Sequence, residues 1–311
     1  MSKRNSLLEL WRFVFCMVVL FFHFFIKAEM DYFHAGYLGV EFFLIVSGYF
    51  VASYYQKKAY GQKWNLRIKS IFTYAWSRLV RLYPLYLLAL ILMLIVRSIF
   101  SWQGFHGVLQ TIKNCYAEFI LLQWSPIGNE VLISAGWFVP AVFFAGLIFV
   151  AILVFTGKIG GYVIAPLTSF FIYRYYFNLI GKIDVIYAHH SIIRGIAGIS
   201  FGVFIYYIVD VLCKLIKQPH IRKIYSLISV SISSLIFLGV FIYTNYGRRS
   251  KWDFLIIALY GIGILLLMSS QFNLPTKVEK VFHFLGKTTY PIYVLQMPVI
   301  ETIMHIIKAV I

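Results

Sequence analysis

The sequence predicts an all-α protein, a polytopic bundle of about nine to ten transmembrane helices. Of its 311 residues, 61% are hydrophobic and only 13% are charged, whereas a soluble domain has about 45–50% apolar and about 25% charged residues. This much apolar surface exceeds what one soluble core can bury. Trp, Tyr and Phe make up 19% of the chain, which suits aromatic belts at two membrane interfaces.

Nine apolar runs are long enough to span a bilayer. They cover residues 7–26, 36–55, 82–99, 136–156, 160–179, 191–209, 226–244, 253–270 and 289–311. A shorter run at 108–124 is interrupted by Lys113, Asn114 and Glu118, so it is predicted to be interfacial or re-entrant. The chain contains no internal repeat and no separate soluble segment, and residues 1–311 are therefore predicted to form one membrane domain.

Basic residues give the bundle a direction. The net charge is +17, and the segment 56–81 holds seven Lys and Arg residues and no acid. With a cytoplasmic N-terminus, nine spans place most basic residues on the inner side, as the positive-inside rule requires. The charge is therefore interpreted as topological, and no nucleic-acid partner is expected. Attraction to lipid headgroups explains any single basic loop equally well.

Two polar residues interrupt the first apolar run. Arg12 and His23 are 11 positions apart, which at about 100° per residue places them on one helix face, about 16 Å apart along the axis. Arg12 would lie near the cytoplasmic end and His23 toward the outer end. An ionisable residue inside a span is a candidate functional residue. The alternatives are an Arg12 that reaches the inner headgroups or pairs with Glu9, and a His23 that only packs.

The second run adds an acid. The stretch "GYLGVEFFLIVSGYF" would run inward from Gly36. Glu41 would then lie a turn or more below the outer surface, at a depth similar to that of His23. A carboxylate beside an imidazole fixes its tautomer and stabilises its protonated form, which a general base requires. We therefore expect Glu41 to approach His23, the alternative being a Glu41 that lines a polar cavity without it.

The third feature is "SRLVRLYPLY", where Arg78 and Arg81 share a helix face before the third span. Guanidinium groups suit bidentate contact with phosphate, although such pairs also occur in ordinary positive-inside loops. Arg174 and Arg194, in or at the ends of spans, could line an outer cavity. His189 and His190 lack a third ligand at metal spacing, so no metal site is expected.

Taken together, these stretches resemble the acyltransferase-3 family of bacterial membrane O-acyltransferases. Arg12, ten residues and His23 match its first-helix signature. "GVEFFLIVSGYF" and "RLVRLYP" resemble its second-helix motif and its entry to the third helix. "GWFVPAVF", with Trp137, and "LGKTTYPIYVLQMPV" resemble two later segments.

The resemblance implies transfer of an acyl group, usually acetyl, from cytoplasmic acyl-CoA to a hydroxyl of a surface carbohydrate such as O-antigen, capsule or exopolysaccharide. By matching position, His23 would be catalytic with Glu41, and Arg12, Arg78 and Arg81 would bind acyl-CoA. Acyl-CoA would be a co-substrate, and no cofactor is expected. His23 would act as a general base or form an acyl-histidine. The location would be the bacterial cytoplasmic membrane, and a homo-oligomer or a contact with polysaccharide assembly machinery stays open.

Three departures from the family pattern stand out. No Glu follows the Trp motif between Phe138 and Phe143, Gln296 stands where many members have His, and nine spans are one fewer than the usual ten. A transporter or flippase of lipid-linked sugar is the alternative function, because it too needs polar residues within spans. Transporters often show repeats and helices broken at matching places, which this sequence lacks.

Overall fold

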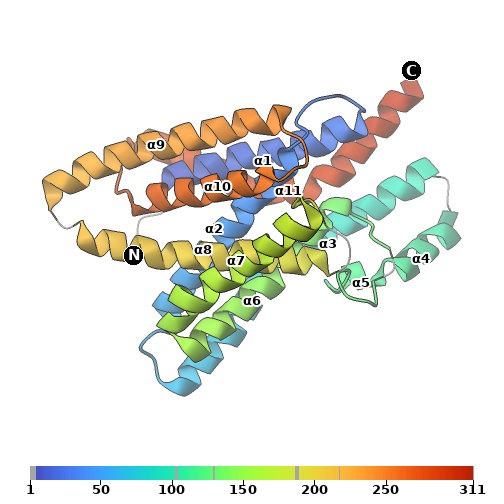
Figure 1. The fold of residues 1–311 in the computed structure, drawn as a ribbon. Helices are drawn as coiled ribbons and strands as arrows, with labels where there is room; N and C mark the ends of the chain where they lie inside the picture. Colours follow the sequence, from blue (N-terminus) through green and yellow to red (C-terminus); the bar gives the residue numbers. More distant parts are fainter. Residues whose placement is uncertain (1–4, 102–103, 129, 186–188, 217, 311) are drawn as a thin grey trace.

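The computed structural model describes residues 5–101, 104–128, 130–185, 189–216 and 218–310, and within these ranges every regular element is a helix (Figure 1). Eight helical segments are long and apolar enough to cross a membrane. They are α1 (Ser6–Lys27), Gly36–Leu38 with α2 (Gly39–Lys58), α3 (Trp64–Ser101), Ser134–Trp137 with α6 (Phe138–Thr156), α8 (His190–Leu215), α9 (Pro219–Tyr246), α10 (Trp252–Ser269) and α11 (Thr276–Val310). The predicted multi-pass helical bundle is confirmed.

Two of the predicted apolar runs form helices that are interrupted or short, which their apolar pattern alone does not specify. The run at 160–179 is helical, but π-helical turns at Gly160–Ile164 and Tyr176–Ile180 flank α7 (Ala165–Tyr175). The interrupted run at 108–124 forms two short helices, α4 (Gly104–Asn114) and α5 (Tyr116–Phe119). Neither α4 nor α5 is long enough to cross a bilayer, which agrees with the predicted non-spanning segment.

Small residues allow α2 and α8 to cross closely. A Cβ atom at Gly48 would overlap the backbone of Ile199, and one at Gly202 would overlap the carbonyl oxygen of Ile45. Gly198, four residues before Gly202, faces Leu44 in the same way. Backbones that approach this closely gain van der Waals contact, which is a main source of helix association in membranes. The crossing fixes which face of α2 points into the bundle.

Helices α1 and α11 run parallel along each other. Ser6 Oγ lies 3.4 Å from Nε2 of His283 near one end, and Lys27 Nζ lies 2.5 Å from Oε1 of Glu301 near the other. These pairs are separated by 277 and 274 positions, so the two helices keep nearly constant register. A position on α1 can therefore be matched to its level on α11.

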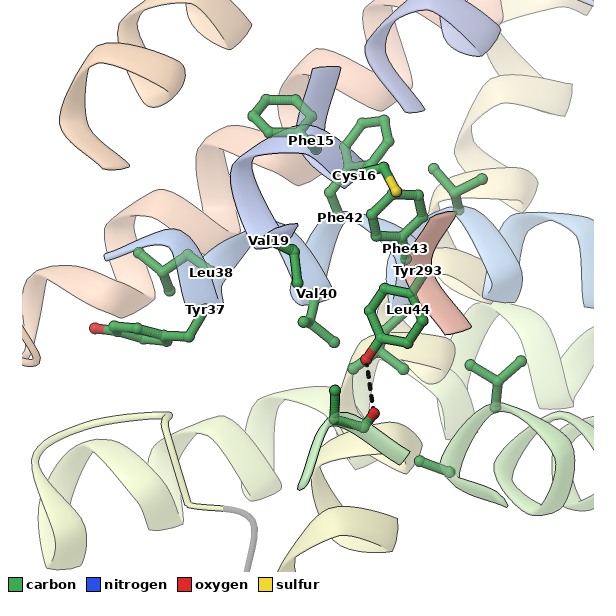
Figure 2. Close-up of a cluster of buried hydrophobic side chains, with 14 of the residues drawn as sticks. Phe15, Cys16, Val19, Tyr37, Leu38, Val40, Phe42, Phe43, Leu44 and Tyr293 are labelled. Carbon is green, nitrogen blue, oxygen red and sulfur yellow. Dashed lines mark hydrogen bonds between the residues drawn. The ribbon is translucent and has the colours of Figure 1, made fainter. Parts of the chain in front are cut away.

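An aromatic core holds α1 against α2. The rings of Phe15 and Phe42 lie 4.8 Å apart, and Tyr260 of α10 meets Phe15 edge-on at 4.9 Å. All three side chains are buried, and Figure 2 shows Phe15 and Phe42 together between their helices. In Figure 1, α9 and α10 lie next to α1 across the upper part of the bundle. The polar side chains of α1 are thus carried on a firmly packed helix.

Candidate active site

A cavity of about 430 Å³ opens between α1, α2, α3, α6 and α11. Arg12 of α1 and both Arg78 and Arg81 of α3 line it, with Glu9 as the one acid among the lining residues. The structure therefore brings together the three arginines that the sequence placed on two separate helices. Three guanidinium groups against one carboxylate give this cavity the charge to receive a polyanion.

Buried neighbours position these arginines. Arg12 Nη1 lies 2.7 Å from Oε2 of Glu9, which is 1% exposed. A Cβ at Gly286 would overlap the Glu9 carboxylate, so the glycine makes room for the acid. The guanidinium of Arg78 lies over the ring of Tyr74, 5.1 Å from its centroid, a favourable cation–π position. The Arg12–Glu9 pairing that the sequence left open as an alternative is formed.

Three aromatic rings line one side of the cavity. They belong to Phe43, Phe138 and Tyr293 and are called here the aromatic floor. Phe138 lies 4.9 Å from Tyr293 and 6.3 Å from Phe43, measured between ring centroids. The Tyr293 hydroxyl donates a hydrogen bond of 3.1 Å to the carbonyl oxygen of Ala135, drawn as the dashed line in Figure 2. This bond ties the floor to the segment that carries Trp137.

His23 does not line the arginine cavity. Its Nδ1 lies 2.9 Å from the carbonyl oxygen of Val19, one turn earlier on α1. A carbonyl oxygen only accepts, so Nδ1 carries the proton and Nε2 is the basic nitrogen. The half-buried imidazole is thus held in the tautomer that can take a proton from a hydroxyl group or attack an acyl carbon.

Gln296 of α11 is a polar side chain beside the His23 ring. It is 2% exposed, and among the described residues neither its amide nitrogen nor its amide oxygen has a partner at hydrogen-bond geometry. Gln296 lies one helical turn beyond Tyr293. His23 therefore lies beside α11 about one helical turn further along than Tyr293, one of the three rings of the aromatic floor.

The predicted approach of Glu41 to His23 is wrong. Both Glu41 oxygens are engaged elsewhere: Oε1 lies 2.5 Å from Nε of Arg194, and Oε2 accepts a 3.0 Å hydrogen bond from the Tyr173 hydroxyl. Glu41 and Arg194 are both completely buried. A buried guanidinium requires a counter-charge. Glu41 therefore pairs with Arg194 and not with His23. The catalytic role assigned to Glu41 stays a prediction.

Arg194 is the centre of a buried polar network. Its Nη1 atom lies 3.5 Å from Oδ1 of Asp184. Its Nη2 atom donates a 3.3 Å hydrogen bond to the carbonyl oxygen of Tyr37. Its guanidinium also lies over the Trp137 ring, 4.8 Å from the centroid. Trp137, the remaining predicted motif position, is thus a stacking platform for Arg194. Sequence reasoning placed Arg194 at an outer cavity, and its position within an apolar run was the signal of a buried partner.

Another buried acid, Glu118, holds the segment that leads to Trp137. Glu118 of α5 is fully buried and accepts hydrogen bonds from the backbone N–H groups of Leu132 and Ile133 and from the Tyr86 hydroxyl. Burial raises the pKa of this carboxyl group to about 7 from its ordinary 4.5, and the hydrogen bonds it accepts oppose that rise. Glu118 therefore anchors the segment that leads into α6.

Within the described ranges, His, Cys, Asp and Glu side chains form no group of three that could hold a metal ion. The comparison with protein families matched residues 5–311 to an acyltransferase domain, that of the acyltransferase-3 family. Neither the curated proteins nor the solved structures gave a match.

Proposed function

The chain belongs to the acyltransferase-3 family, and from that premise we propose that this multi-pass membrane protein is an O-acyltransferase acting across the bilayer. It takes an acyl group, acetyl in the simplest case, from cytoplasmic acyl-CoA. The acceptor is a hydroxyl group of an extracytoplasmic or lipid-linked carbohydrate. The observation that carries the proposal is the convergence of Arg12, Arg78 and Arg81 on one cavity. Arg12 belongs to α1, the helix that also carries His23.

The arginine cavity is the donor side. Phosphate oxygens of CoA pair with guanidinium groups in the bidentate geometry that arginine favours. The basic segment 56–81, which contains Arg78 and Arg81, is cytoplasmic by the positive-inside rule, and this is the compartment that holds acyl-CoA. The pantetheine arm then points along α1 toward His23, about 16 Å from Arg12 along the helix axis.

The reaction takes place at the level of His23. Nε2 of His23 removes the proton from the acceptor hydroxyl as its oxygen attacks the thioester carbonyl carbon. The tetrahedral intermediate collapses, the C–S bond breaks, and the departing CoA sulfur takes the proton back from the imidazolium. His23 does not line the cavity, and we place the aromatic floor of Phe43, Phe138 and Tyr293 between the two. The floor must then open for the thioester to pass.

The proposal is tested with radiolabelled acetyl-CoA offered to membranes in the presence of the candidate glycan. Wild-type membranes should label the glycan, and His23→Ala should reduce the rate by about 10²–10⁴-fold, the usual contribution of a general base. His220→Ala is the matched control because His220 is exposed and distant in sequence. Full labelling by the His23→Ala protein would refute the proposed mechanism.

Donor binding is tested separately. The double variant Arg78→Ala with Arg81→Ala should weaken acyl-CoA binding to the purified protein, and binding by the wild type should weaken as salt concentration rises. Lys57→Ala with Lys58→Ala is the charge-matched control, because both lysines are exposed and neither lines the cavity. Equal losses in the two double variants would show that only general basicity matters.

A further inference from the structure

The side-chain amide of Gln296 is a buried polar group inside α11, 2% exposed. Among the described residues neither its nitrogen nor its oxygen has a partner at hydrogen-bond geometry, although the amide lies close enough to the His23 imidazole to interact with it. Buried amides in proteins are nearly always hydrogen-bonded, so each exception calls for an explanation. One explanation is a bound group that completes the site during function.

The surroundings of the amide indicate which group this is. Gln296 faces the His23 ring and lies one turn beyond Tyr293 of the aromatic floor. On the proposed function, a thioester that crosses the floor arrives at this level, next to Nε2 of His23. When the acceptor oxygen attacks, the carbonyl oxygen becomes negatively charged, and a donor held in place beforehand stabilises that charge.

Three other donors named above are already committed. Arg194 pairs with Glu41 and Asp184, the Tyr173 hydroxyl donates to Glu41, and the Tyr293 hydroxyl donates to a backbone carbonyl. The amide of Gln296 has no acceptor, and it differs from the unpartnered hydroxyl of buried Tyr260, which packs on Phe15, because it lies beside His23. We propose that the side-chain N–H of Gln296 stabilises the oxyanion of the tetrahedral intermediate, and that Gln296 is a catalytic residue beside His23.

This inference rests on the proposed function. It predicts that removing the amide lowers activity without lowering stability. Gln296→Met keeps the approximate side-chain volume and removes the amide. Turnover should fall by about 10²–10³-fold, as for the loss of one oxyanion donor, with little change in the KM for acetyl-CoA. The thermal midpoint in detergent should stay the same or rise, because an unsatisfied buried polar group is replaced by an apolar one.

Gln296→His restores an N–H donor at the same position and should recover part of the turnover. A Gln296→Met protein that turns over like the wild type would overturn the inference. So would a lower thermal midpoint for Gln296→Met, because a purely structural amide loses stability when it is removed. If the wild type transfers no acyl group at all, the proposed function fails, and that result is distinct from either outcome in the variant.

Discussion

Removing the positive charge of Arg194 should destabilise the bundle strongly, and removing Glu41 as well should restore most of the loss. Both side chains are completely buried, with Nε 2.5 Å from Oε1. In Arg194→Met, Glu41 keeps only the Tyr173 hydroxyl as a partner, so an uncompensated carboxylate remains in the interior. Breaking a buried ion pair in this way costs about 3–5 kcal/mol.

The double variant Glu41→Met with Arg194→Met contains neither charge. Apolar replacements of both members of a buried pair are often neutral or stabilising, so the double variant should be more stable than either single variant. Their non-additivity is then a coupling energy of several kcal/mol between the two sites, which a double-mutant cycle isolates.

The free energy of unfolding is measured for all four proteins in mixed micelles, by titration with sodium dodecyl sulfate. Tryptophan fluorescence reports the transition, since the Trp137 ring lies under the Arg194 guanidinium. Arg249→Met is the control, because that side chain is 46% exposed in its ion pair and its loss should cost less than about 1 kcal/mol. Additive losses in the double variant would refute the reasoning, since they would mean that the two charges do not compensate each other.

Three further outcomes are expected. Gly202→Val should abolish the monodisperse peak in size-exclusion chromatography because its side chain overlaps the backbone of α2, whereas Gly239→Ala, with no atom within 4 Å of the added Cβ, should not. Because burial raises the pKa of Glu118 to about 7, the folded protein retains a proton that the unfolded chain loses above about pH 4.5. The free energy of unfolding should therefore fall by roughly 3 kcal/mol as pH rises through that window, and Glu118→Gln should flatten this dependence. In a protein with His23→Cys, a membrane-impermeant thiol reagent is added from the side of the arginine cavity. Adding Phe138→Ala should let this reagent reach the new cysteine. No labelling of that cysteine would mean that Phe138 does not close the floor.

The position of residues along each apolar helix was predictable from the sequence. Apolar runs locate the candidate spans, and the 11-residue spacing of Arg12 and His23 fixes their axial separation on a continuous helix. The structure has that helix as α1 (Ser6–Lys27), with Arg12 among the lining residues of the cavity and His23 outside them. The sequence also indicated the family through short motifs, and the family comparison covers the same chain.

The rotation of each helix about its axis was not predictable. Glu41 was expected at the depth of His23, but Gly39 lies against the carbonyl oxygen of Phe15 and Phe42 packs on the Phe15 ring, so Glu41 lies nearer to the level of Phe15. Glycine contacts between α2 and α8 accompany its pairing with Arg194, which is 153 positions away in the chain. These close contacts between helices are not encoded in the pattern of any single helix. The unpartnered amide of Gln296 was equally hidden, because hydrogen-bond satisfaction is a property of the packed bundle.

The aromatic floor also has an electrical consequence. A continuous water path from the arginine cavity to His23 and beyond would conduct ions through the bundle. In an energised membrane, each elementary charge that crosses dissipates about 2.3 kcal/mol per 100 mV. Phe43, Phe138 and Tyr293 line the cavity with rings that carry no charge. With this floor closed between the cavity and His23, as proposed, a positively charged cavity open to one compartment would not be continuous with the other, and the bundle would remain an insulator.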